Sequence, residues 1–166
     1  MAKNYRPTFV SRLSVNQLCW FIFAFLVAHV IEEFPRFPEW ATRHFGTTTT
    51  GFYILSHIPL LMGVFFIVYR SSRDQRHGIW ISFAVLVQWA LFINGIFHVA
   101  TTLGFGEYSP GLVTALVLYL PFTIYFLKRI LRDGYLSHTQ VASSCIGGTV
   151  LAVLIISSLW LNMGFI

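Results

Sequence analysis

The chain has 166 residues, of which 56% are hydrophobic and only 10% are charged. Soluble domains have about 25% charged residues, so this composition excludes an ordinary soluble protein and indicates a chain largely covered by lipid. The length suits a single domain, and we expect one transmembrane domain over residues 1–166. The net charge of +5 comes from short basic clusters between apolar runs, which favours membrane lipid as a partner over nucleic acid.

Five apolar segments approach the length of about 20 residues that crosses a bilayer. They cover residues 15–34, 51–69, 78–103, 111–131 and 140–166. Their apolar runs are continuous and do not alternate, so they predict helices and not the strands of a barrel. We therefore expect an all-α integral membrane bundle of about five transmembrane helices.

The basic residues between these segments and at their ends are distributed unevenly. Nine lie in the N-terminal flank and in the loops after the second and fourth segments: Lys3, Arg6, Arg12, Arg70, Arg73, Arg76, Lys128, Arg129 and Arg132. The loops on the opposite side contain Arg36 and Arg43 alone. Because loops rich in Lys and Arg stay in the cytoplasm, the N-terminus is predicted to be cytoplasmic and the C-terminus outside.

Polar residues gather near the ends of segments predicted to lie on the outer side. These residues are His29, Glu32, Glu33, His57, Asn94, His98 and Glu107. Positions three and four apart share a helix face, so His29 is expected beside both glutamates and Asn94 beside His98. Ionisable side chains at membrane depth cost several kcal/mol unless they are paired, and a cation or a shared proton would relieve that cost.

A purely structural interpretation of these residues is also open. The glutamates would then lie in water at the interface, and His29 would only join two helices by a hydrogen bond. A single histidine in a helix favours that interpretation, whereas the combination of His29, Glu32, Glu33, Asn94 and His98 favours a functional site.

The segment His29-Val30-Ile31-Glu32-Glu33 resembles the signature of the HXXEE-domain family. Phe37–Trp40, Asn94–His98 and Tyr108–Ala115 are similar to further motifs of that family, and the likeness covers nearly the whole chain. The resemblance implies a bacterial multi-pass membrane protein, which we expect in the inner membrane, with a site at these motifs. It implies no reaction.

Our first hypothesis is a metal-dependent enzyme. Histidine with carboxylate is a ligand set for zinc, the first choice, and then for iron or manganese. We expect His29, Glu33 and His98 to be the ligands, with His57 and Glu107 as further candidates. One position would remain open for water, which would attack an ester, amide or phosphate of a lipophilic small molecule.

The catalytic residues of such a hydrolase are predicted to be Glu32, Glu33 and Asn94. Glu32 would orient a ligand or act as the general base. Asn94 shares a helix face with His98 and would complete the site.

Two other functions remain open from the sequence. Without a metal, a glutamate beside a histidine suits an acid–base isomerase or cyclase of an isoprenoid- or sterol-like substrate, with aromatic rings stabilising a cation. A non-enzymatic protein would instead bind or conduct a proton or cation, or bind haem between His29 and His98. A homo-oligomer is compatible with all of these.

Overall fold

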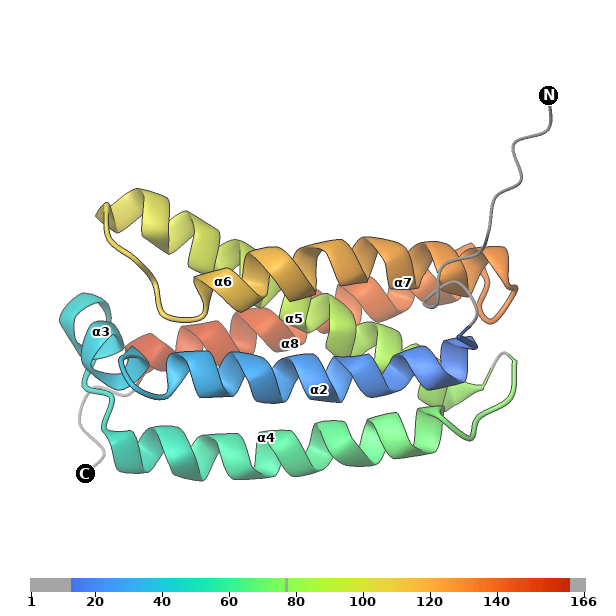
Figure 1. Ribbon diagram of the computed structural model, residues 1–166, viewed down its shortest axis with the longest axis horizontal. Helices are drawn as coiled ribbons and strands as arrows, with labels where there is room; N and C mark the ends of the chain where they lie inside the picture. Colours follow the sequence, from blue (N-terminus) through green and yellow to red (C-terminus); the bar gives the residue numbers. More distant parts are fainter. Residues whose placement is uncertain (1–12, 77, 162–166) are drawn as a thin grey trace.

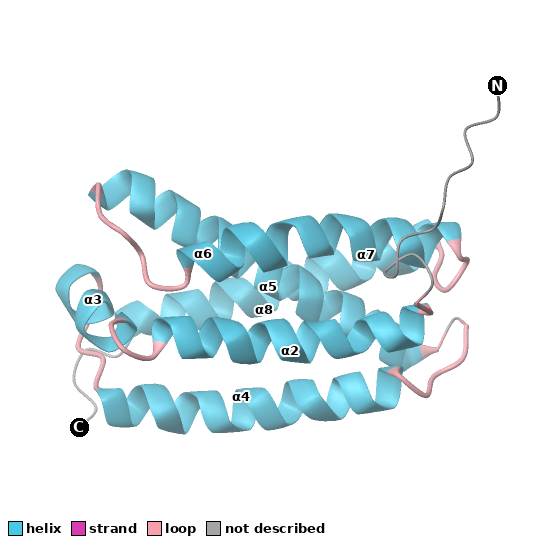
Figure 2. Ribbon diagram, viewed as in Figure 1, coloured by secondary structure: helices cyan, strands magenta, loops and turns pink. Residues whose placement is uncertain are grey.

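The computed structural model describes residues 13–76 and 78–161, and its regular structure there is entirely helical. In chain order the helices, shown in Figure 1, are α2 (Val15–Glu33), α3 (Phe37–His44), α4 (Thr50–Ser71), α5 (Ile79–Phe105), α6 (Leu112–Thr114), the π-helical segment η1 (Ala115–Tyr119), α7 (Leu120–Arg132) and α8 (His138–Leu161). Short loops join them, coloured separately in Figure 2.

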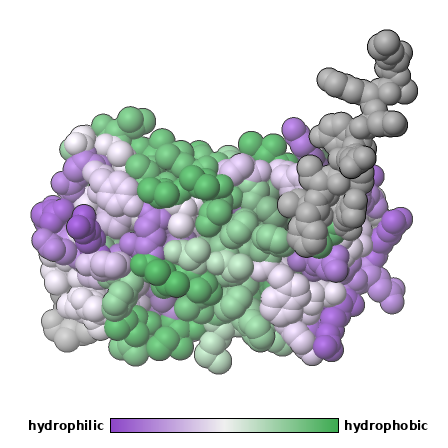
Figure 3. Space-filling model, in the orientation of Figure 1, coloured by the Kyte–Doolittle hydropathy of each residue, from purple (hydrophilic) through white to green (hydrophobic). Residues whose placement is uncertain are grey.

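Five spans in this structure are long and apolar enough to cross a membrane. They are Val15–Glu33, Thr50–Ser71, Ile79–Phe105, Leu112–Arg132 and His138–Trp160. The prediction of a helical multi-span membrane protein is therefore confirmed, and the far end of the fifth predicted segment lies outside the described residues. An apolar band crosses the visible face in Figure 3, with polar residues gathered toward both ends. The orientation of the bundle stays a prediction.

Polar side chains satisfy the exposed backbone N–H groups at the starts of the long helices. Ser14 and Gln17 form a reciprocal capping box at α2, and the Thr49 hydroxyl accepts from the Phe52 N–H at α4. The carboxylate of Asp74, in the preceding loop, accepts from the N–H of Trp80 at 2.8 Å at the start of α5. Each helix thus begins at a residue that the local sequence specifies.

Helix α5 is the centre of the bundle, because it contacts α2, α4, α8 and the fourth span. Its closest neighbour is α8, where Gly148 has no side chain. A Cβ at that position would lie 2.5 Å from the backbone oxygen of Leu86. The missing side chain therefore allows the two helices to approach each other.

The fourth span contains a π-helical turn over η1. The N–H of Leu120 donates to the carbonyl of Ala115, five residues earlier, and Pro121 follows without an N–H to donate. The wider turn brings the ring of Tyr119 to 4.7 Å from the ring of His29. A local irregularity of the helix therefore lies directly against the polar site.

Helix α3 was not expected from the sequence as a separate element. Pro38 lies in its first turn with Glu39, and Arg43 lies in its last turn, an arrangement that complements the helix dipole. Phe37 and Trp40 are buried, and Trp40 contacts Phe97 and Phe105 of α5. The short helix therefore covers one end of the bundle.

Candidate metal centre

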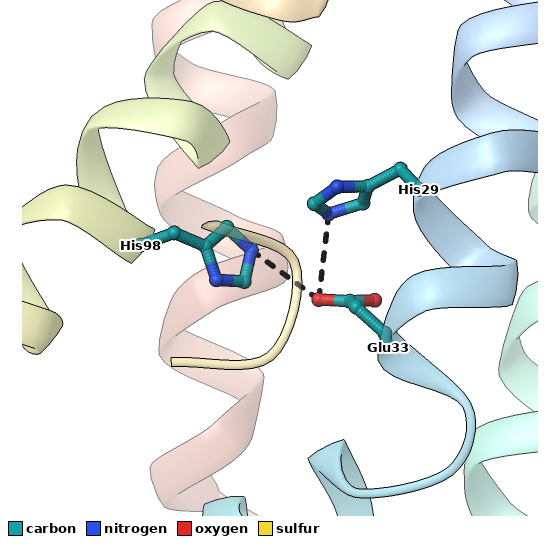
Figure 4. A group of neighbouring side chains, drawn as sticks. All are labelled: His29, Glu33 and His98. Carbon is teal, nitrogen blue, oxygen red and sulfur yellow. Dashed lines mark ion pairs between the residues drawn. The ribbon is translucent and has the colours of Figure 1, made fainter. Parts of the chain in front are cut away.

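Three buried side chains meet at the end of the bundle that α3 covers. His29 and Glu33 come from the last turns of α2 and His98 from α5, and their relative exposures are 2%, 5% and 0%. Oε1 of Glu33 lies 3.4 Å from Nε2 of His29 and 3.2 Å from Nε2 of His98 (Figure 4). Within the described residues, these three side chains are a group whose ligand atoms are close enough to hold a metal ion.

The other nitrogen of each imidazole is held by a hydroxyl group. Nδ1 of His29 lies 2.7 Å from the Thr114 hydroxyl, which itself donates to the Gly111 carbonyl and must therefore accept from His29. Nδ1 of His98 lies 2.9 Å from the Ser109 hydroxyl. With the protons on Nδ1, both Nε2 atoms direct a lone pair toward Glu33.

Three electron-rich atoms then face one another in a buried space. Two imidazole lone pairs and a carboxylate oxygen repel one another unless a cation or a proton lies between them. Zinc bonds of 2.0–2.2 Å place tetrahedral ligands about 3.4 Å apart, and the two Glu33 contacts are 3.4 and 3.2 Å. The spacing thus suits a small metal ion.

Asn94, one turn before His98 on α5, contacts both histidines. Its Nδ2 lies 3.1 Å from Nε2 of His29 and 3.2 Å from Nε2 of His98. The amide donates to both lone pairs as it stands. Rotated by half a turn, it presents Oδ1 at the same place, where it can act as a fourth ligand.

The second oxygen of Glu33 faces α4. It accepts from the Tyr53 hydroxyl at 2.9 Å, and Nε2 of His57 lies 3.9 Å away. Nδ1 of His57 donates to the Tyr53 carbonyl at 2.7 Å, and the two rings stack. His57 therefore directs Nε2 toward the same carboxylate, but at a greater distance than His29 and His98.

Glu32 points away from this group, although it is adjacent to Glu33. It accepts from the N–H groups of Val113 at 3.0 Å and Thr114 at 2.8 Å, and from the Tyr108 hydroxyl. Burial and the Glu32 carboxylate raise the pKa of Tyr108 to about 12. Glu32 thus holds the start of the fourth span, where Thr114 in turn contacts His29.

The loop between α5 and α6 passes close beneath both imidazoles at Gly111. This glycine has a φ of +101°, which L side chains rarely adopt. A Cβ there would also lie 2.6 Å from Cε1 of His29 and 2.8 Å from Cε1 of His98. Backbone conformation and space therefore both require glycine at this position.

Glu107 does not belong to the group, contrary to its expected place as a further ligand. Its carboxylate lies 2.6 Å from Nε2 of His44 and 3.4 Å from Arg43. These contacts, the hydrogen bond to His44 first, lower the pKa of Glu107. Because α5 ends at Gly106 in a left-handed conformation, the loop carries Glu107 to α3 and away from the histidines.

The sequence interpretation missed three residues that contact the candidate ligands: Tyr53, Ser109 and Thr114. Spacing along a helix cannot identify them, because Thr114 is 85 positions from His29. Ser109 and Thr114 do lie inside the segment Tyr108–Ala115 that resembled a family motif. That likeness was the only feature of the sequence that pointed to Ser109 and Thr114, and it did not include Tyr53.

Fold and site together define a multi-pass helical membrane protein with a buried His-Glu-His group able to hold a metal. Residues 20–126 match the family model described as "Protein of unknown function with HXXEE motif", and the chain belongs to that family. It is similar to the uncharacterized protein YrkK of Bacillus subtilis (strain 168), with 26% identity over 147 residues, 83% of this chain and 90% of the relative. No solved structure matches the chain.

Proposed function

We propose that this protein is a membrane-embedded, metal-dependent enzyme of hydrolase type that acts on a lipophilic substrate. The observation that carries the proposal is the convergence of two Nε2 atoms on a buried carboxylate oxygen, with a hydroxyl group at hydrogen-bond distance from each Nδ1. The ligand types favour zinc, followed by iron and manganese.

The surrounding residues supply what a hydrolytic site needs. His29, Glu33 and His98 would hold the ion, which lowers the pKa of a bound water toward neutrality. Asn94 lies against the same nitrogens and can hold the water or the substrate oxygen. His57 is the nearest further base, since its Nε2 faces Glu33 and 21% of its side chain is exposed.

Elemental mass spectrometry of detergent-purified protein tests the metal directly. We expect about one equivalent of zinc, iron or manganese in the parent protein and less than about a tenth of that in His98→Ala, because two ligands hold an ion poorly. His138→Ala is the matched control, since His138 is exposed at the start of α8. A parent free of metal after supplementation, or full occupancy in His98→Ala, would refute the assignment.

A second candidate is metal-free acid–base catalysis on an isoprenoid- or sterol-like molecule. The observation that favours it is that both Nε2 atoms lie close to one oxygen of Glu33, while the Tyr53 hydroxyl donates to the other oxygen. One added proton on either Nε2 would then satisfy the group without a metal. A metal-free parent whose Glu33→Gln variant loses lipid isomerisation would support this candidate.

Haem fits the observed geometry less well. Asn94 and Oε1 of Glu33 both contact both Nε2 atoms, and a porphyrin between His29 and His98 would have to displace them. A haem visible spectrum in purified protein would overturn this view.

A further inference from the structure

A cavity of about 420 Å³ lies beside the metal centre, between α4, α5 and α8. Three polar side chains in its wall contact the centre: Tyr53 and His57, which face Glu33, and Asn94, which lies against the histidine ligands. Most of the remaining wall is aliphatic or aromatic. The cavity therefore has a polar end at the metal centre and apolar walls elsewhere, a pattern typical of small-molecule sites.

A smaller cavity of about 90 Å³ lies deeper in the bundle. Its wall is apolar apart from His29 and Asn94. Four residues line both cavities: Leu60, Asn94, Ile155 and Ile156. Asn94 thus marks the place where the cavities adjoin. This volume is about that of three water molecules in the liquid. The space therefore admits the end of one hydrocarbon chain and not the ends of two.

The larger cavity opens between two spanning helices. Its exposed wall residues include Ser56 on α4 and Leu154 and Ile155 on α8. Helices α4 and α8 both contact α5 but make little contact with each other. Because both helices are long and apolar enough to cross a membrane, the opening between them gives a molecule in the lipid a route to the cavity.

We infer that these cavities bind an amphiphile with a small polar head and one long hydrocarbon chain, which enters between α4 and α8. The head lies at Asn94 and His57, and the chain lies along the apolar walls of the two cavities. The inference names the substrate class of the proposed enzyme and rests on that function for the reaction. Binding itself requires only the cavities.

Photolabelling with hexadecanol that carries a diazirine on its last carbon tests the inference. After irradiation of detergent-purified protein, we expect labelled peptides at cavity residues such as Leu60 and Ile156, with labelling suppressed by excess unlabelled hexadecanol. Labels confined to outward residues such as Met62 and Phe66, unaffected by the competitor, would overturn it.

A pair of variants on α4 separates the cavity from the lipid-facing surface. Leu60→Trp fills the junction of the cavities and should reduce competed labelling about tenfold. Gly63→Trp places the same side chain where nothing lies within 4 Å of the new Cβ, and it should label like the parent. Equal labelling of the two variants would refute the inference, and the site mapping on the parent decides the question if Leu60→Trp fails to fold.

The metal assay and the labelling experiment fail independently. Competed labelling of cavity residues in a protein free of metal would support the amphiphile site and refute the metal-dependent function. A metal-loaded protein without competed labelling would refute the amphiphile site and leave the metal centre standing.

Discussion

The two adjacent glutamates of the family signature bind different partners. Glu33 turns inward to His29 and His98, whereas Glu32 accepts hydrogen bonds from the start of the fourth span. The first is placed to hold an ion and the second to hold the loop beneath it. The two carboxylates thus make separate contacts around one candidate site.

Gly111 offers a sharp test at the residue scale. In Gly111→Ala the methyl group meets both imidazoles, and we expect bound metal to fall by at least about tenfold as the rings are displaced. The positive φ alone costs about 1–3 kcal/mol of stability. Metal content and the unfolding temperature in detergent are the two measurements.

Gly106→Ala is the matched control for that variant. Its φ of +66° also imposes a backbone cost, although a smaller one, and nothing lies within 4 Å of the new Cβ. It should lower the unfolding temperature and leave the metal content unchanged. Parental metal content in Gly111→Ala would show that the loop does not shape the site.

The Tyr108 contact predicts a pH dependence. Its phenol donates to Glu32 only while protonated, and its pKa is raised from 10.0 to about 12. The contact therefore stabilises the protein fully below pH 10 and is lost as the pH rises through about 12. In an ultraviolet titration of tyrosinate, Tyr108→Phe should lack a step near pH 12, and Glu32→Gln should move that step toward pH 10. If the step that Tyr108→Phe lacks is centred near pH 10 in the parent protein, the contact is contradicted.

Spacing predicted the parts of the site that lie on one helix. The i, i+4 rule put Glu33 beside His29 and Asn94 beside His98, and the structure brings these four together. It could not place Glu107, whose direction depends on how the chain leaves α5 at Gly106. Nor could it find hydroxyl partners such as Thr114, since serine and threonine have many roles in membrane helices.

At the scale of elements, the closest packing is between α5 and α8. Gly148→Ala places a methyl group against the backbone of α5, so we expect a loss of about 1–3 kcal/mol, measured by thermal unfolding in detergent. Gly63→Ala is the control, because it meets no neighbour and Ala is the better helix former by about 1 kcal/mol. Equal unfolding temperatures for the two variants would argue against this packing.

The long helices were predictable and the irregular ones were not. The apolar runs of the long helices, and caps such as Ser14 and Thr49, are local features of the sequence. The π-helical turn before Pro121 packs against α5 and α2, and these contacts are not visible in the sequence. Pro38 and Glu39 did carry a signal for α3, but the helix is too short to show a periodic pattern.

For the whole molecule, the bundle has a polar site at one end and basic loops at the other. The uneven distribution of Lys and Arg predicts that the site faces outward. A membrane-impermeant maleimide should therefore label Thr47→Cys in intact bacterial cells and label Gln75→Cys only after permeabilisation. Both positions are exposed, whereas the native Cys19 is buried. The reverse pattern would invert the orientation, and the parent protein gives the background from Cys145.

X-ray absorption spectroscopy at the edge of the bound metal tests the central claim most directly. For purified parent protein, we predict scattering from two imidazoles with oxygen ligands at about 2.0–2.2 Å, and from one imidazole in any metal retained by His98→Ala. A spectrum without imidazole scattering, or a parent protein that binds no metal, would contradict a centre built from His29, Glu33 and His98.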